Sequence, residues 1–332
     1  MIQHALYSVP NRATGYCTDD VARGFIVALG HLRLAGNDRL AHRLAGTYLA
    51  YLQHAQMENG LFHNFMDYDR RWADDCGTQD CCGRAIWALG YGVSASPSQS
   101  WRRVCAALLD RVLASSPLPE SLVYLRSRAY AALGLSYAYA ASKDERYAEA
   151  LRQLTGAMLA QYESCATADW PWFEETMTYD NARLPEAMIR SGAVLGEPSY
   201  HAAGLTALRF YERVTVENGV FVPIGNDGWY RRGGPRARYG QQPLEACAMV
   251  DAQLAAFDLT GEIAHFAGAE LALEWYYGKN SRGIVMVAGG GCYDGLEKDA
   301  VNYNMGAEST LALLAAAYAL AARRGRVLRA VR

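Results

Sequence analysis

The chain has 332 residues, half of them hydrophobic, with 22 tyrosines, 7 tryptophans and a formal net charge of −2. A charge so close to zero gives no reason to expect nucleic acid or an anionic membrane as a partner. No 18 apolar residues run together without interruption, so a membrane span is not expected. The eight cysteines show no CxxC spacing and no framework of the secreted type, which favours free thiols, no metal site and a cytoplasmic location.

Helical periodicity dominates the chain, and many of the periodic stretches begin near Asp, Ser or Asn and end at Gly, as helix capping favours. The predicted helices cover residues 19–35, 38–56, 80–91, 99–114, 121–141, 145–162, 180–195, 199–213, 243–259, 262–277 and 306–323. Strand signal is confined to two short segments, 219–223 and 283–288. Most of the Trp, Asn, Asp and Gly residues fall in long loops, at 57–78, 163–178, 214–241 and 278–304.

One junction between loop and helix recurs along the chain. A loop rich in Gly and aromatic residues runs into a helix whose first turn carries an acid and often an arginine. The junction occurs at 15–23, 77–85 and 179–183, with weaker echoes at 127–129, 242–246 and 306–309. Its spacing of roughly 50–65 residues is a periodic signal of the kind that repeated helical hairpins produce.

Six such hairpins predict an all-α (α/α)6 toroid, with the long loops and their acids at one mouth. We expect residues 1–332 to form a single domain of this kind. Because a double-layered (α/α)6 barrel needs twelve helices, one outer helix should be short or missing.

Three stretches resemble a group of bacterial proteins of the six-hairpin glycosidase type, often labelled glycosyltransferase-associated. They are residues 15–23, 59–65 and 172–183. The resemblance covers most of the chain and implies an (α/α)6 toroid and a saccharide ligand, but no established catalytic residue. The wider superfamily includes inverting hydrolases, phosphorylases, unsaturated-uronide hydrolases and sugar epimerases, so the fold alone does not choose the reaction.

Glycoside cleavage needs one protonated and one ionised carboxyl group. Glu175 follows the aromatic run 170–173, and lost hydration there would raise its pKa toward that of a usable acid, so it is the predicted proton donor. Asp20, one turn before Arg23, is the predicted base. The further catalytic candidates are Asp80, Asp180 and Glu245. Helix capping and ordinary Asp–Arg pairing on a helix surface are the competing interpretations of these acids.

Aromatic residues beside Asn, Asp and Arg suit a sugar, because rings stack on its faces while polar groups bind its hydroxyls. The predicted substrate-binding residues are Tyr16, Asp19, Arg23, His63, Asn64, Trp72, Trp170, Trp172, Tyr179, Asn181, Arg183, Trp229, Tyr303 and Glu308. Packing of the loops on one another is the competing interpretation of the aromatic residues.

These residues favour an inverting glycoside hydrolase that acts on an oligosaccharide and needs no cofactor. A phosphorylase is one alternative, since the four arginines of segment 231–238 could bind phosphate. A sugar epimerase is a second, although proton abstraction tends to use a pair of histidines and only His63 lies in a motif-like loop. A non-catalytic glycan-binding module that partners a transferase is the third. The sugar, the linkage and the oligomeric state stay open.

Overall fold

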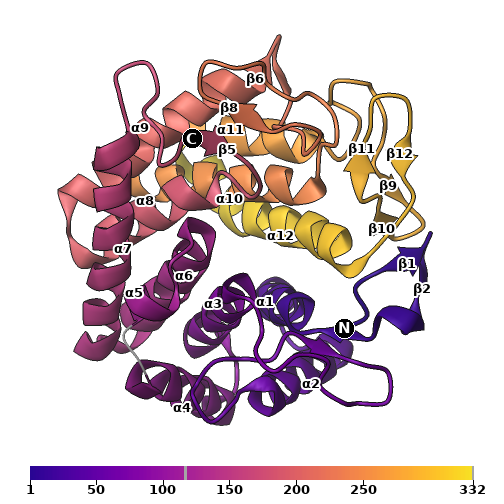
Figure 1. Ribbon diagram of the computed structural model, residues 1–332, viewed down its shortest axis with the longest axis vertical. Helices are drawn as coiled ribbons and strands as arrows, with labels where there is room; N and C mark the ends of the chain where they lie inside the picture. The colour runs from indigo at the N-terminus through magenta and orange to yellow at the C-terminus, as the bar shows by residue number, and fades with distance from the viewer. Residues whose placement is uncertain (116–117, 331–332) are drawn as a thin grey trace. The chain divides into compact units, whose positions relative to one another are not determined.

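The computed structural model describes residues 1–115 and 118–330, and helices dominate both parts (Figure 1). All eleven predicted helices are present: α1 (Thr18–Ala35), α2 (Arg39–Ala55), α3 (Gln79–Ala95), α4 (Gln99–Ser115), α6 (Leu125–Ser142), α7 (Glu145–Cys165), α8 (Arg183–Leu195), α9 (Pro198–Thr215), α10 (Pro243–Thr260), α11 (Ile263–Glu274) and α12 (Ala307–Ala330). A twelfth helix, α5 (Leu118–Ser121), has a single turn and was not predicted. The described residues thus contain eleven long helices, one fewer than a double-layered (α/α)6 barrel needs, and that the missing one is an outer helix stays a prediction.

Short antiparallel strand pairs tie the long loops together, and each strand has two residues. Among the described residues the pairs are β1 (Ala5–Leu6) with β2 (Val9–Pro10), β3 (Tyr16–Cys17) with β4 (Phe65–Met66), β5 (Thr176–Met177) with β8 (Tyr230–Arg231), β6 (Val216–Glu217) with β7 (Val220–Phe221), β9 (Val287–Ala288) with β10 (Gly291–Cys292), and β11 (Gly295–Leu296) with β12 (Val301–Asn302). Both predicted strand segments contain one of these strands, namely β7 and β9.

The chain divides into two compact units. Unit 1 contains Met1–Gln3, Asn11–Met158 and Arg190–Pro198. Unit 2 contains His4–Pro10, Leu159–Ile189 and Ser199–Arg332. The single domain expected over residues 1–332 stays a prediction.

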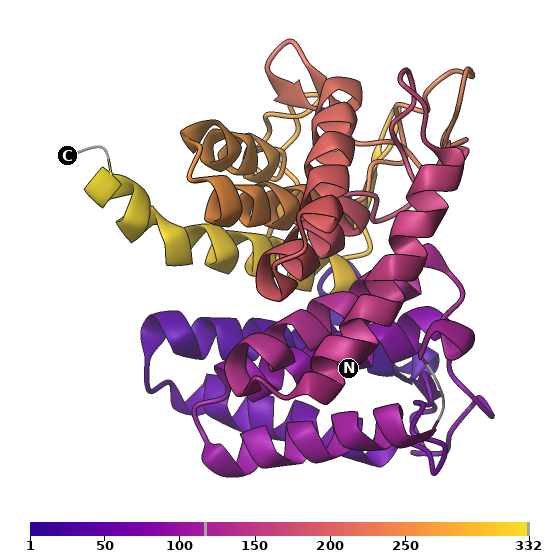
Figure 2. The same ribbon diagram turned by 90° about the vertical axis from the view of Figure 1, so that its left-hand side faces the viewer.

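In unit 1, α3 packs against α1, α4 and α6, and its contact with α6 is backbone against backbone. A Cβ atom at Gly90 would overlap the backbone of Gly134, and one at Gly83 would overlap that of Ser127. Only glycine permits so close an approach of two helices. Figure 2 shows these helices side by side in unit 1. The approach brings the first turns of α3 and α6 together.

In unit 2, α10 is buried along almost its whole length and packs against α11 and α12 (Figures 1 and 2). Its sequence is apolar on all faces, as expected for a helix inside a core. The N-terminal half of α10 contains two acidic residues, Glu245 and Asp251. A carboxylate that is withdrawn from water needs hydrogen-bonding or charged partners. These two side chains belong to the polar cluster described below.

No helix in the described part of the chain is long and apolar enough to cross a bilayer. All eight cysteines are free thiols. The adjacent thiols of Cys81 and Cys82, at the start of α3, contact the carbonyl oxygens of His63 and Phe62 at 3.7 and 3.9 Å. Burial raises the pKa of the Cys82 thiol to about 11, so it stays protonated at neutral pH and serves as a weak donor that holds the 57–78 loop.

Candidate active site

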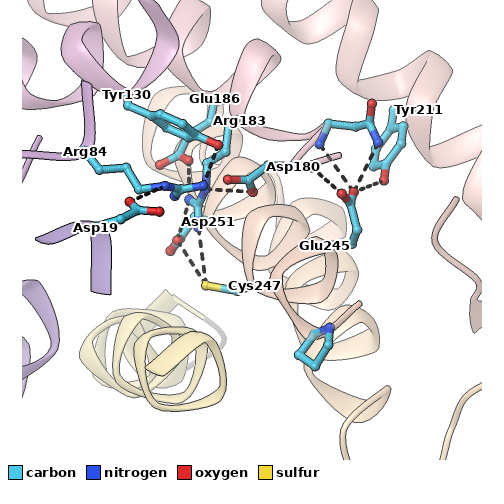
Figure 3. A network of polar contacts seen from close by, with 12 residues as sticks. Asp19, Arg84, Tyr130, Asp180, Arg183, Glu186, Tyr211, Glu245, Cys247 and Asp251 are labelled. Atoms are coloured by element: carbon cyan, nitrogen blue, oxygen red, sulfur yellow. Dashed lines mark hydrogen bonds and ion pairs between the residues drawn. The ribbon is translucent and has the colours of Figure 1, made fainter. Parts of the chain in front are cut away.

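The acids of the predicted junctions gather into two polar clusters, one within each unit (Figure 3). Cluster 1, in unit 1, consists of Asp19, Asp20, Arg23, Asp80, Arg84, Ser127 and Tyr130. Cluster 2, in unit 2, consists of Asp180, Asn181, Arg183, Glu186, Tyr211, Glu245, Cys247 and Asp251. Within each unit, acids from different junctions lie in one cluster, and the prediction that all six junctions share a single mouth stays a prediction.

Cluster 1 centres on the Asp19 carboxylate, in the first turn of α1. Arg23 donates from Nη1 to Asp19 Oδ2 at 3.0 Å and to Asp20 Oδ1 at 2.9 Å. Arg84, from α3, places Nε 2.8 Å from Asp19 Oδ1. The Asp20 side chain is completely buried, whereas that of Asp19 is 19% exposed. Asp19 is therefore the more exposed carboxylate of this pair.

The first turn of α6 completes cluster 1. Arg84 donates from Nη2 to the Tyr130 hydroxyl at 2.6 Å, and its guanidinium carbon lies 3.8 Å from the centroid of the same ring. A cation over an aromatic face is attracted by the ring quadrupole, most strongly where water is excluded. Ser127 donates to Asp80 Oδ1 at 2.5 Å. The close approach of α3 to α6 through glycine makes both contacts possible.

Cluster 2 is built around the Arg183 guanidinium, in the first turn of α8. Its Nη1 donates to Glu186 Oε2 at 2.6 Å and to Asp251 Oδ2 at 2.7 Å, and its Nε lies 3.5 Å from Asp180 Oδ1. Its Nη2 lies 3.3 Å from the sulfur of Cys247. Burial by itself lowers the pKa of Arg183, but the surrounding carboxylates reverse the effect and hold that pKa well above its ordinary value.

Glu245, in the first turn of α10, accepts hydrogen bonds on both carboxyl oxygens. Its Oε2 accepts from the Tyr211 hydroxyl at 2.9 Å and from the backbone and side-chain nitrogens of Asn181 at 3.3 Å, and its Oε1 accepts from the backbone N–H of Asp180. Burial, the largest cause, and the negative charge of Asp180 raise the pKa of Glu245 to about 7, although the hydrogen bonds from Tyr211 and Asn181 oppose the rise. Glu245 can therefore give or take a proton near neutral pH.

The backbone at Asp180 explains how the loop presents two N–H groups to one carboxyl. Asp180 has φ = 48°, in the left-handed region that Asp and Asn enter more readily than other residues. Successive N–H groups in such a turn form a concavity that binds anions. For the same reason α8 begins only at Arg183, so the helix predicted over 180–195 started three residues too early.

The two clusters differ in their balance of charge. As defined, cluster 1 has three carboxylates and two guanidiniums, whereas cluster 2 has four carboxyls, Asp180, Glu186, Glu245 and Asp251, and one guanidinium. Like charges gathered in a buried site favour protonation of one member. Glu245 is the member whose pKa rises.

The predicted environment of Glu175 is wrong. Its side chain is 62% exposed and lies 3.5 Å from Arg232 Nη1, whereas Trp170 and Trp172 turn into the core of unit 2. The aromatic rings have the greater apolar area to bury, and an ionised carboxylate loses hydration if it follows them. The dehydration on which its role as proton donor rested is therefore absent at Glu175 and present at Glu245.

Several predicted sugar-binding side chains have partners within the protein. Trp172 stacks on Tyr211 at 5.6 Å between ring centroids, and Trp170 donates from Nε1 to the Glu174 carbonyl at 2.9 Å. Trp72 packs against His63 at 4.6 Å between ring centroids. These contacts agree with the competing interpretation of loop packing, and sugar contact by these rings stays a prediction.

The other predicted binding residues differ in exposure. Asn64 is buried and accepts from the Cys17 thiol at 3.5 Å. Tyr303 is half exposed, and the partly exposed residues are Tyr16, Tyr179, Trp229 and Glu308. Their predicted roles are not contradicted by their positions.

His63 has a partner that its sequence motif did not reveal. Its Nδ1 lies 3.0 Å from Asp74 Oδ1 and 2.9 Å from the Asp74 carbonyl oxygen. A carboxylate at Nδ1 sets the tautomer and leaves Nε2 for proton transfer. Asp74 Oδ2 also accepts from the backbone N–H groups of Asn64 and Phe65, at 2.8 and 2.7 Å, which fixes the carboxylate in place.

Seven residues of the two clusters were not predicted as site residues: Arg84, Ser127, Tyr130, Glu186, Tyr211, Cys247 and Asp251. For Asp251 a signal existed, because an acid in the middle of a largely apolar helix sequence indicates a charge with a partner inside the protein. Tyr130 and Tyr211 carry no such signal among 22 tyrosines.

Sites for phosphate or a metal are not evident in the described residues. Arg236 donates from Nη1 to the carbonyls of Val214 and Val222 at 2.8 and 2.7 Å, and Arg238 lies 2.7 Å from Glu217, so two of the four arginines hold their own loop. In the part of the chain that the structure describes, no group of three or more His, Cys, Asp or Glu residues is arranged to hold a metal ion.

No family model matches this chain, and no curated protein matches it. Several solved structures, however, are similar to this chain. A sugar epimerase from a ruminal bacterium is 13% identical with a TM-score of 0.73, covering 96% of this chain and 90% of that one. A D-mannose isomerase is 13% identical with a TM-score of 0.72, covering 97% and 91%. A GH76 α-mannanase of Bacteroides thetaiotaomicron is 12% identical with a TM-score of 0.67, covering 95% and 88%. At these identities the likeness shows the fold alone: the chain has the predicted (α/α)6 toroid fold.

Proposed function

We propose that this protein is a glycan-processing enzyme, an inverting glycoside hydrolase that acts on an oligosaccharide, with Glu245 as proton donor and Asp180 as the second carboxylate. The observation that carries the proposal is the buried Glu245 carboxyl, whose pKa is raised to about 7 beside Asp180. Neighbouring titratable groups whose environments separate their pKa values mark acid–base sites. Asp180 replaces Asp20, and Glu245 replaces Glu175, as the favoured pair.

In the proposed reaction Glu245 gives its proton to the glycosidic oxygen as the bond to the anomeric carbon breaks. Asp180 takes a proton from water, and the resulting hydroxide equivalent attacks the anomeric carbon from the opposite face, which inverts its configuration. The Glu245 carboxylate left behind is stabilised by the N–H groups of Asp180 and Asn181 and by the Tyr211 hydroxyl. Arg183, 3.5 Å from Asp180, supplies a counter-charge to the base.

The likeness in fold to an α-mannanase supports a hydrolase, and the likeness to an epimerase and an isomerase supports the alternative below. The cytoplasmic location and the absence of a cofactor stay predictions from the sequence.

The test is product analysis against α- and β-linked manno-, gluco- and galacto-oligosaccharides, with and without phosphate, with the anomer of the first product read by proton NMR. E245Q and D180N should each lower kcat by about 10²–10⁴-fold. E175Q is the matched control and should keep its activity. Full turnover in E245Q, or loss in E175Q, would contradict the assignment. Dependence on phosphate would show a phosphorylase instead.

A sugar epimerase or isomerase is the second candidate, and the pairing of His63 with Asp74 favours it. His63 Nε2 could then move a proton at the carbon next to a sugar carbonyl. Incorporation of solvent deuterium at that carbon of a free reducing sugar, lost in H63N and kept in E245Q, would establish this reaction. Glycan binding without turnover by any variant would indicate the non-catalytic module.

A further inference from the structure

Unit 2 carries an exposed aromatic surface away from the hydrogen bonds of cluster 2. Tyr7, at the turn between β1 and β2, is 54% exposed, and Tyr303, after β12, is 50% exposed. Their ring centroids lie 5.3 Å apart, and Tyr293 meets the Tyr303 ring edge-on at 5.6 Å. We call Tyr7, Tyr293 and Tyr303 the tyrosine platform. Figure 1 shows the β1–β2 hairpin beside the strands of the 287–302 segment.

The scaffold beneath the platform is fixed by hydrogen bonds. The backbone carbonyl oxygen of Tyr7 accepts from the backbone N–H of Met305 at 3.1 Å. The Asn304 side chain accepts from the Ala5 N–H at 2.8 Å and donates to Asp294 Oδ2 at 3.0 Å, and Asp294 in turn accepts from the Ser309 hydroxyl. A surface held in place before binding loses little conformational entropy when a ligand arrives. The rings are therefore preorganised although they face solvent.

The groups around the rings are mostly neutral, and the Asp294 carboxylate beneath them is bound to Asn304 and Ser309. The segment His4–Pro10 contains no Lys, Arg, Asp or Glu. Ser8 and Asn302, next to Tyr7 and Tyr303 in the sequence, are exposed and offer a hydroxyl and an amide. Ring faces beside neutral hydrogen-bonding groups match the apolar faces and hydroxyls of a sugar, and they offer little to an anionic polymer or membrane.

We propose that the tyrosine platform is a glycan-binding site in addition to the catalytic cluster, and that it binds a neutral oligosaccharide by stacking on Tyr7 and Tyr303. This inference rests on the proposed function for the class of its ligand. A protein partner is the competing occupant, because Leu6 and Val9 beside the platform are also exposed.

Binding to the full chain is the test, measured by isothermal titration with mannopentaose, cellopentaose and maltopentaose. Y7A and Y303A should each weaken binding of at least one of them about tenfold, as the loss of one stacked ring predicts. Y7F keeps the ring and should bind like the wild type. Y277A is the matched control, because Tyr277 is 55% exposed in the same unit and makes no ring contact with another residue that the structure describes. Melting temperatures check that the variants fold.

The proposal is overturned if the wild type binds none of the three sugars, or if Y7A and Y303A bind as tightly as Y277A. Self-association that Y7A abolishes, without any sugar binding, would assign the surface to protein contact and overturn it as well. Turnover separates this proposal from the catalytic one: Y7A should keep kcat on a disaccharide, whereas E245Q should lose kcat and keep platform binding. Loss of sugar binding in Y7A alongside full turnover in E245Q would uphold the platform and contradict the hydrolase.

Discussion

Clusters 1 and 2 start from the same local arrangement and end as different chemical environments. Each has an aspartate followed three residues later by an arginine, Asp20 with Arg23 and Asp180 with Arg183, at 2.9 and 3.5 Å. In cluster 1 the Arg23 side chain is 13% exposed, and Arg84 brings a second cation to the Asp19 carboxylate. In cluster 2 three carboxylates converge on Arg183, whose side chain is 5% exposed.

The difference shows that the spacing of acid and base along a helix does not determine what the pair does. Cluster 1 matches its acids with nearby guanidiniums. Cluster 2 gathers more acids than cations away from water, and a proton on Glu245 relieves the repulsion near neutral pH. Proton transfer is therefore expected from cluster 2 and charge pairing from cluster 1.

The largest difference should appear when the shared arginine is removed. R183M leaves the buried Glu186 and the partly buried Asp251 without their cation, which should lower the free energy of unfolding by about 3–5 kcal/mol. R23M should cost less, about 1–3 kcal/mol, because Arg84 remains beside Asp19 and only the buried Asp20 loses its cation. Urea unfolding of the two variants at pH 7 measures both losses. Equal losses would contradict the contrast between the clusters.

The pH dependence of stability should reveal the proton on Glu245. Its pKa in the folded chain, about 7, lies above the ordinary value of 4.5, so the folded state binds the proton more tightly. The stabilisation is complete below pH 4.5 and is lost as the pH rises through 7, by about 3 kcal/mol in total. E245Q should lack this change relative to the wild type, whereas E175Q should keep it. An unchanged profile in E245Q would show that another group titrates.

Two tyrosine substitutions, one in each cluster, should each lower the free energy of unfolding by about 1 kcal/mol. Y130F removes the acceptor of Arg84 in cluster 1, and Y211F removes a donor to Glu245 in cluster 2. Both should lower stability, but only Y211F should raise the pKa of Glu245 and move the alkaline limb of the activity profile upward, by roughly 0.5–1 pH unit. The pH profile of kcat for both variants checks this. Equal shifts would mean that Tyr211 acts by packing alone.

The smallest effect is expected outside both clusters. E175Q breaks a solvent-exposed pair with Arg232 and should change the free energy of unfolding by less than about 0.5 kcal/mol. The pair is screened by salt, so even this change should vanish at high ionic strength. Thermal melts of E175Q and the wild type without added salt and at about 0.5 M salt, which is enough to screen the pair, would measure this change in stability. A loss comparable to that of R183M would restore Glu175 as a buried, functional acid.

Much of the fold could be predicted from the sequence, because helix periodicity and capping are local properties. All eleven long helices were found, and the repeated junction at Asp19, Asp80 and Asp180 indicated the (α/α)6 architecture. The errors lie where backbone conformation departs from the helical pattern. Asp180, at φ = 48°, delays the start of α8, and the single turn of α5 is too short to show a period.

The candidate site was predictable only in part. The acids at the starts of helices, Asp180 and Glu245 among them, are visible in the sequence because their type and position recur. Their separate roles are not visible, since burial, the approach of Asp251 on α10 to Arg183 on α8, and the hydroxyl of Tyr211 on α9 all depend on packing between helices. A pKa depends on hydration and on neighbouring charge in three dimensions. The sequence alone therefore determined which acids to consider, and the tertiary structure moved the proposed proton donor from Glu175 to Glu245.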